Sequence, residues 1–177
     1  MKEIIIINGS GGVGKDTFVE FCQKYCKVKN ISSVDKVKEA ARVLTGWDGT
    51  KDEKSRKLLV DLKELGIKYN DAPFKYIIES AKEFRESKDE ELMFVHIREI
   101  SEIEKVRVGS NAKTLLVTNK NVPLITSNES DKNVMNYQYD FYIRNDGTLE
   151  ELDSIAKQFV DGFKLRENEI NLEDEER

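Results

Sequence analysis

The chain has 177 residues, a length that suits one domain, and its 38% hydrophobic and 36% charged residues indicate a globular protein with a highly charged surface. Its formal net charge of −5 predicts no general attraction to nucleic acids or anionic membranes. No apolar run approaches the roughly 20 residues that would span a bilayer, so we expect no membrane partner.

The two cysteines, Cys22 and Cys26, lie one helical turn apart. This spacing could suggest a metal or redox pair, but no third cysteine and no nearby histidine completes a site. Two reduced thiols are therefore the better interpretation, and they predict a cytoplasmic protein. The first strand begins almost at the first residue, so we also expect no signal peptide.

The most informative stretch is residues 4–17, where four isoleucines are followed by a glycine-rich segment. The isoleucines have no polar face and predict a strand buried on both sides. Gly9-x-x-x-x-Gly14-Lys15 then has the spacing of a phosphate-binding loop, whose amides, lysine and following helix N-terminus attract one anion. The alternative is a glycine-rich turn without a ligand. The candidate nucleotide-binding residues are Gly9, Ser10, Gly11, Gly12, Val13, Gly14, Lys15, Asp16 and Thr17.

Helical periodicity follows this loop. Phe18, Phe21, Cys22 and Tyr25 predict the first helix, and residues 28–34 predict a short strand. A helix beginning at Asp35 would bury Val37, Ala40, Ala41 and Leu44. The next helix would begin with a capping box, Thr50-x-x-Glu53, bury Leu58, Leu62 and Leu65, and end at Gly66. A turn at 70–73 would lead into a helix with Pro73 in its first turn and Phe74, Ile77, Ile78, Ala81 and Phe84 inward.

The second half of the chain contributes three further strands, over residues 92–97, 112–118 and 139–143. A short helix with Ile100, Ile103 and Val106 inward separates the first two. Residues 119–138 are polar and show no clear periodicity. A capping box, Thr148-x-x-Glu151, begins a final helix that buries Leu152, Ile155, Ala156, Phe159 and Phe163. We therefore predict a single domain over 1–165 and an acidic, fraying tail over 166–177.

Five buried strands alternating with helices predict a parallel sheet covered on both faces. In such sheets, ligands bind beyond the carboxyl ends of the strands. The polar segments 9–17, 32–35, 96–99, 118–121 and 145–147 all follow predicted strands. We expect them to surround one cleft.

Three blocks of sequence resemble the P-loop nucleoside monophosphate kinases. They are Gly14-Lys15-Asp16-Thr17, residues 34–39 with Arg56 downstream, and His96-Ile97-Arg98-Glu99. Residues 139–149 also resemble the last strand and helix of that group, and the chain is most similar to its deoxynucleoside monophosphate kinases. The resemblance implies a three-layer α/β/α fold with a five-stranded parallel sheet in the order 2-3-1-4-5. It also implies a phosphotransferase, monomeric or homodimeric, that uses ATP and Mg²⁺ and acts on a small phosphorylated acceptor.

The donor-side roles follow from the resemblance and from the needs of phosphoryl transfer, where a protein mainly positions anions and stabilises charge. Lys15 would hold the β- and γ-phosphates, and Thr17 would lie near the α-phosphate. Asp16 occupies the position where most P-loops have the Mg²⁺-binding Ser or Thr. Its carboxylate could serve as a metal ligand, or it could simply be an acid that satisfies the helix dipole.

The acceptor side is expected near Asp35, Lys38, Arg42 and Arg56. Asp35 could accept a hydrogen bond from the acceptor, and one of the two arginines could grip its phosphate; alternatively, Asp35 is an N-cap and the arginines are solvated. The strongest candidate for stabilising transferred charge is Arg98, so we assign the catalytic roles to Lys15, Arg98 and Asp35. Arg107 and Lys113 are weaker candidates for a closing lid.

His96 departs from the family pattern, in which this strand usually ends with an aspartate that holds the Mg²⁺ water shell. A neutral imidazole is a poor partner for Mg²⁺. His96 could instead contact substrate or orient a water, or it could be an ordinary histidine at a strand end. The departure keeps two alternatives open: a kinase for a non-nucleotide acceptor, and a catalytically impaired ATP-binding regulator. A GTPase is less favoured, because residues 119–122 match the guanine signature only in part.

Overall fold

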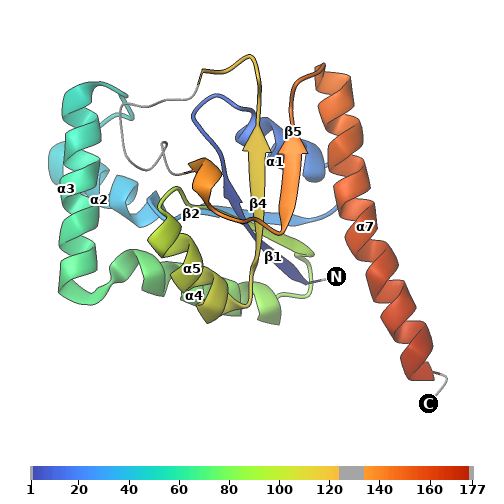
Figure 1. The fold of residues 1–177 in the computed structure, drawn as a ribbon. Helices are drawn as coiled ribbons and strands as arrows, with labels where there is room; N and C mark the ends of the chain where they lie inside the picture. Colours follow the sequence, from blue (N-terminus) through green and yellow to red (C-terminus); the bar gives the residue numbers. More distant parts are fainter. Residues whose placement is uncertain (1, 124–133, 176–177) are drawn as a thin grey trace.

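The computed structural model describes residues 2–123 and 134–175, with the backbone alone for 166–175. Helices and strands alternate along the chain (Figure 1). The strands are β1 (Glu3–Asn8), β2 (Val28–Ser32), β3 (Leu92–His96), β4 (Lys113–Thr118) and β5 (Phe141–Arg144). The helices are α1 (Lys15–Cys22), α2 (Asp35–Thr45), α3 (Glu53–Asn70), α4 (Ala72–Glu86), α5 (Ile100–Ser110), the 3₁₀ turn η1 (Val134–Asn136) and α7 (Leu149–Glu175).

The five strands form one parallel sheet in the order β2-β3-β1-β4-β5, which confirms the predicted fold class and strand order. Isoleucine side chains that alternate along β1 point to opposite faces of the sheet. Ile5 and Ile7 pack in a core with α1 and α7, whereas Ile4 and Ile6 pack in a second core with α4 and α5. The predicted three layers are therefore present, and β1 is buried on both faces.

Because all five strands run in one direction, their carboxyl ends lie at one edge of the sheet, which is the upper edge in Figure 1. The loops that follow β1, β3, β4 and β5 meet there. This arrangement brings the predicted polar segments to the same side of the molecule.

Two helix boundaries, at the end of α1 and at the start of α3, differ from the sequence predictions. Tyr25 lies beyond α1, because the chain tightens after Cys22 into a turn in which the Tyr25 amide donates to the Cys22 carbonyl. Thr50 does not cap α3; the Asp52 carboxylate does, accepting from the Ser55 amide at 2.7 Å. The capping box predicted for α7 is confirmed: the Thr148 amide donates to Glu151, and the Glu151 amide donates to the Thr148 hydroxyl.

The prediction that Gly66 ends a helix is also wrong, because α3 continues to Asn70 and the chain turns at Asp71, in the left-handed conformation with φ 59°. A Cβ on Gly66 would lie 3.7 Å from Ala72 Cβ and 3.8 Å from Pro73 Cδ. The glycine therefore marks close packing between α3 and the start of α4.

Two apolar side chains that the periodicity placed inside are exposed: Leu44 is 72% and Leu65 is 63% exposed. Ala40 is exposed as well. The reason is that α2 and α3 pack on each other and on α4 at the side of the sheet (Figure 1), so each helix has one face that no described element covers.

The last predicted strand is shifted by two residues, and it begins at Phe141 rather than at Tyr139. The helix α7 runs through 166–175, so these residues have a helical backbone; the fraying of the tail stays a prediction, and 176–177 lie outside the described residues.

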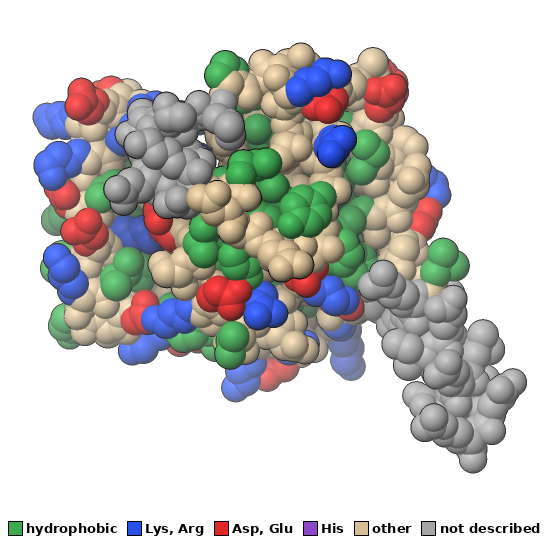
Figure 2. Space-filling view, in the orientation of Figure 1, with side chains coloured by type: hydrophobic (Ala, Val, Ile, Leu, Met, Phe, Trp, Pro, Cys, Tyr) green, Lys and Arg blue, Asp and Glu red, His purple; other side chains and the backbone are tan. Residues whose placement is uncertain are grey.

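Lys, Arg, Asp and Glu side chains are scattered over the face in Figure 2. Within the described ranges, no helix combines the length and the apolar character that crossing a bilayer requires.

Candidate active site

The glycine-rich segment forms a tight loop between β1 and the N-terminus of α1. Gly9, Gly12 and Gly14 have φ angles of 143°, 83° and 94°, which glycine tolerates far better than other residues. Gly14 is the N-cap residue of α1. The amides of the first helical turn therefore begin directly where the loop ends, as a phosphate site requires.

Two of these glycines also allow close contacts. A Cβ on Gly9 would lie 2.3 Å from the Val117 carbonyl oxygen, and one on Gly14 would lie 2.3 Å from Asn145 Nδ2. Asn145 Nδ2 donates to the Val13 carbonyl at 3.0 Å, so the loop after β5 is fastened to the phosphate loop. Contacts from β4 and from the loop after β5 thus fix the phosphate loop in place.

The Lys15 ammonium lies over this loop. It donates to the Gly9 carbonyl at 2.6 Å and to the Ser10 carbonyl at 2.8 Å. The positive charge therefore sits next to the amides of the loop and the N-terminus of α1. Together they form a positively polarised concavity that suits a polyphosphate.

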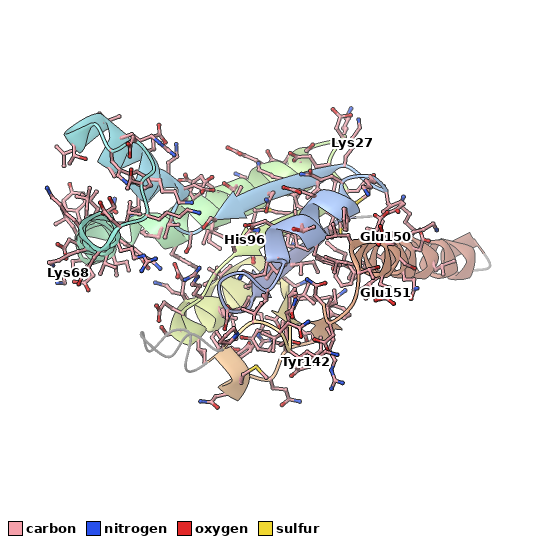
Figure 3. The ribbon with its side chains drawn as sticks, turned by 90° about the horizontal axis from the view of Figure 1, so that it is seen from above. Lys27, Lys68, His96, Tyr142, Glu150 and Glu151 are labelled. Carbon is pink, nitrogen blue, oxygen red and sulfur yellow. The ribbon has the colours of Figure 1, made fainter. Side chains whose placement is uncertain are left out.

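His96 ends β3 beside this loop, near the middle of the molecule when it is viewed from above (Figure 3). Its side chain is 16% exposed, and its Nδ1 lies 3.8 Å from the Asp16 carboxylate. Its Nε2 lies 2.9 Å from Asn30 Oδ1 on β2, which can only accept a hydrogen bond. Nε2 therefore carries the proton, and in the neutral ring Nδ1 presents a lone pair toward Asp16.

The charges around His96 are those of the predicted site. Burial lowers the pKa of His96 below its ordinary value, Lys15 and Lys38 act in the same direction, and Asp16 and Asp35 act against it. The donor-side and acceptor-side candidates therefore surround a neutral imidazole.

Asp35 is held in place at the beginning of α2. One carboxylate oxygen accepts from the Ser32 amide at 2.7 Å, and the other lies 3.9 Å from Lys38 Nζ. Arg42 lies two turns farther along α2, about 10 Å from Asp35 by helix rise, and its guanidinium packs 5.3 Å from the Trp47 ring. The structure thus brings Asp35 and Lys38 to His96.

Arg56 is exposed on the first turns of α3. No described contact joins it or Arg42 to the loop, so their phosphate-binding roles stay predictions. The lid candidates are displaced: Arg107 pairs with Glu104 on α5, and Lys113 pairs with Glu3 at the amino end of the sheet, opposite the phosphate loop.

Arg98 follows β3 by two residues and is exposed. Its backbone carbonyl accepts from Asn8 Nδ2 at 3.3 Å, so Arg98 is tied to the residue that precedes the phosphate loop.

Sequence reasoning missed Asn8, although the signal was present: it is a polar residue directly after four buried isoleucines. It also missed Asn30 and Tyr139, whose roles depend on contacts between distant segments, whereas Asn145 lies in a segment that was expected at the cleft.

A cavity of about 530 Å³ opens on the other side of the phosphate loop. Its walls come from the loop, the ends of β4 and β5, and η1. The lining residues are Ser10, Val13, Val117, Thr118, Asn119, Lys120, Val122, Pro123, Val134, Met135, Arg144 and Asp146. A mainly apolar cavity next to a phosphate loop has the size and position to hold the base of a nucleotide.

The residues at the loop suit a magnesium ion that comes with a nucleotide. Mg²⁺ is usually held by one or two carboxylates, waters and substrate phosphates rather than by a full set of protein ligands. Asp16 supplies one exposed carboxylate. No cluster of three or more metal-ligating side chains occurs among residues 2–123 and 134–165, where side chains are described.

No protein-family model and no curated protein sequence matches the chain. Solved structures do match it, among them the three below. The Deinococcus radiodurans tunicamycin resistance protein is 14% identical with a TM-score of 0.54, and the alignment covers 90% of this chain and 96% of that one. TT1252 from Thermus thermophilus is 21% identical with a TM-score of 0.52, covering 90% and 97%. Aquifex aeolicus shikimate kinase is 12% identical with a TM-score of 0.47, covering 92% and 98%.

These identities are low, so the similarity concerns the fold alone. Together with the strand order, it shows that the chain shares the three-layer α/β/α fold of these structures, with a five-stranded parallel sheet in the order 2-3-1-4-5. Fold and function are separate questions, because one fold can carry many chemistries. The activity therefore has to be argued from the site.

Proposed function

We propose that the protein is an ATP-dependent phosphotransferase that moves the γ-phosphoryl group to a small phosphorylated acceptor, with a nucleoside monophosphate as the leading candidate. The observation that carries this proposal is the phosphate loop. Its positive-φ glycines, the Lys15 ammonium at its carbonyls and the α1 N-terminus converge on one point. A glycine-rich turn without a ligand would not need a lysine ammonium and a helix N-terminus at the same point.

The geometry suggests a division of tasks. Lys15 and the loop amides would bind the β- and γ-phosphates, and the cavity beside the loop would take the base. When bound, Mg²⁺ would neutralise charge on the phosphates, with Asp16 as its carboxylate ligand. Arg98 would approach the transferred group from the end of β3.

The acceptor would bind on the His96 side of the loop. Lys38 supplies a cation there, and Asp35, fixed by the Ser32 amide, supplies an oriented acceptor of hydrogen bonds. A cation for a phosphate and a carboxylate for a hydroxyl or base amine are the two contacts that a phosphorylated acceptor requires. This pairing favours a phosphorylated acceptor over a neutral one.

The direct test is a transfer assay with the purified chain, Mg-ATP and a panel of acceptors. The panel contains nucleoside and deoxynucleoside monophosphates and non-nucleotide phosphomonoesters. We expect one nucleoside monophosphate to stimulate ADP formation, and Lys15→Ala to remove the stimulation. Stimulation by a non-nucleotide phosphomonoester alone would assign a different acceptor class, and ADP formation that no acceptor stimulates would contradict the proposal.

A second candidate function is an ATP-binding regulator without turnover, and His96 is the observation that favours it. This imidazole is neutral, donates to Asn30, and stands where the family has an acid. The assay is therefore repeated with His96→Asp. Tight ATP binding by calorimetry with no transfer in either protein would support the regulator, whereas transfer by the wild-type chain would exclude it.

A further inference from the structure

Asn8, the last residue of β1, is completely buried and links three segments. Its Oδ1 accepts from the Gly9 amide at 2.7 Å. Its Nδ2 donates to the Arg98 carbonyl at 3.3 Å and to the Tyr139 hydroxyl at 2.9 Å. The Tyr139 hydroxyl in turn donates to the Val134 carbonyl in η1 at 3.0 Å.

Only one arrangement of protons satisfies this network. The Gly9 amide can only donate, so Oδ1 of Asn8 must face it; the Arg98 and Val134 carbonyls can only accept. The Tyr139 hydroxyl therefore donates to Val134 and accepts from Asn8. Burial raises the pKa of Tyr139 to about 12, so the hydroxyl keeps its proton at neutral pH.

The network connects two segments that line the cavity beside the phosphate loop. Ser10 and Val13 of the loop and Val134 and Met135 of η1 all belong to its lining. The hydrogen bonds run from Gly9 through Asn8 and Tyr139 to Val134, and a side branch holds the backbone of Arg98.

The Tyr139 ring is held independently of its hydroxyl. It packs edge-to-face on Tyr137 at 4.8 Å and on Tyr142 at 5.9 Å between centroids. Removal of the hydroxyl alone therefore leaves the ring in place and breaks only the connection between η1 and Asn8.

We propose that Asn8 and Tyr139 are positioning residues. They hold the phosphate loop, the η1 segment of the base cavity and the backbone of Arg98 in fixed positions relative to one another. This inference rests on the proposed function, since it concerns the donor site of the same phosphotransferase. Neither side chain touches the donor. Both act through the backbone groups that they hold, and preorganised groups bind and react better than groups that must first be ordered.

The test measures ATP binding by calorimetry in the presence of Mg²⁺, using Tyr139→Phe, Asn8→Ala and the matched control Tyr142→Phe. Tyr142 is the control because it belongs to the same aromatic cluster but is 60% exposed, and its hydroxyl accepts only from the Tyr139 amide among the bonds described here. Calorimetry gives both the dissociation constant and the fraction of binding-competent protein. A purely structural role would reduce that fraction and leave the dissociation constant unchanged.

For Tyr139→Phe we expect the dissociation constant for ATP to rise about fivefold to tenfold, the factor that corresponds to one hydrogen bond, at an unchanged stoichiometry. Asn8→Ala should weaken binding further and also slow transfer, because it releases Gly9 and Arg98 together. Tyr142→Phe should bind as the wild-type chain does. If Asn8→Ala does not fold, Tyr139→Phe decides alone.

A dissociation constant for Tyr139→Phe equal to that of Tyr142→Phe would overturn the inference, and so would a fall in stoichiometry alone. If the wild-type chain binds ATP but transfers no phosphoryl group, the proposed function fails and the binding series still tests the network. A wild-type chain that binds no ATP would refute both.

Discussion

The phosphate loop and the α2–α3 arm, which comprises residues 35–45 and 53–70, differ in how closely the rest of the protein surrounds them. The loop is fixed from several sides: Gly9 lies against Val117, Gly14 lies against Asn145, and Asn8 holds the first amide. In the arm, the 18-residue helix α3 buries only Ser55, and Val43 of α2 is 85% exposed. Lys68, on α3, lies at the outer edge of the molecule in Figure 3.

This difference indicates how each region can respond to change. The conformation of the loop is determined by steric contacts with neighbouring strands. An added side-chain atom at Gly9, for example, would therefore clash with the backbone of β4. The arm is held on one side only, by packing of α2 and α3 on each other and on α4 and by the ion pair between Lys63 and Glu102 of α5. Its exposed faces carry ion pairs one turn apart, such as Lys57 with Asp61 and Lys68 with Glu64. Such exposed pairs contribute little to stability, so most substitutions on these exposed faces should be tolerated.

The largest expected contrast is between two glycine substitutions. Gly9→Ala adds a Cβ 2.3 Å from the Val117 carbonyl oxygen at a φ of 143°, and we expect it to destabilise the protein by more than about 3 kcal/mol and to abolish ATP binding. Gly46→Ala, directly after α2 of the arm, also has a positive φ, of 69°, but its Cβ would meet no atom within 4 Å. It should cost roughly 1 kcal/mol.

Urea unfolding and ATP calorimetry on both variants measure this contrast. The φ of Gly9, 143°, lies outside the left-handed region that Gly46 occupies at 69°, so the difference combines the close contact with the greater backbone strain at Gly9. Equal losses of stability would show that the loop is not constrained by β4 as described.

The next contrast concerns side chains that the periodicity placed inside. Ile77 on α4 is completely buried under the sheet, whereas Leu65 on α3 is 63% exposed. Truncation of Ile77 to alanine should cost about 3 kcal/mol, and truncation of Leu65 should cost less than about 1 kcal/mol. Similar losses in the urea midpoints would mean that the arm packs against another surface in solution.

A third contrast separates two lysines by their role. Lys15→Ala removes the ammonium from the loop, and we expect ATP affinity to fall about tenfold to a hundredfold, the range for hydrogen bonds to charged groups. The melting shift caused by ATP should shrink accordingly. Lys57→Ala in the arm breaks only an exposed pair with Asp61 and serves as the control. An unchanged melting shift in Lys15→Ala would contradict the loop assignment.

The same comparison explains how much of the structure the sequence predicts. The strand of isoleucines and the loop were predictable because glycine spacing and an all-apolar strand have few structural solutions, whereas the strand order was implied by the resemblance to P-loop nucleoside monophosphate kinases. Leu44 and Leu65 were mispredicted since periodicity identifies an apolar face but not whether another element covers it. The meeting of Asn8 with Tyr139, 131 positions apart, depends on tertiary packing that no local pattern records.

The site shows the same division. Asp35 and Lys38 were identified because they follow a predicted strand end, where ligands gather in parallel sheets. Asn30 was not, since it lies inside β2, and only the register of β2 with β3 brings it close to His96. Site residues at strand ends can thus be predicted from the sequence, whereas a residue whose role depends on a contact with a neighbouring strand cannot.

The smallest expected effect concerns the residue that caps the start of α3. Asp52 accepts from the Ser55 amide and caps α3, so Asp52→Ala should lower the melting temperature by about 2–4 °C, whereas Thr50→Ala, at the position that the sequence pattern favoured, should have a smaller effect. The hydrogen bond from the Ser55 amide lowers the pKa of Asp52 below its ordinary value.

The effect of this cap should therefore depend on pH. A carboxylate with a lowered pKa in the folded state contributes stability that is present above its unfolded pKa and is lost as the pH falls through its folded pKa. The difference in melting temperature between the wild-type chain and Asp52→Ala should be full at neutral pH and should shrink in acid, below roughly pH 4. The effect of Thr50→Ala should also fade in acid, because the Thr50 hydroxyl donates to the Asp48 carboxylate and lowers its pKa, so the two variants are distinguished by the size of the loss at neutral pH. A larger loss from Thr50→Ala than from Asp52→Ala would move the helix start back to Thr50, and a difference that persists in acid would exclude the ionised Asp52 carboxylate as the cap.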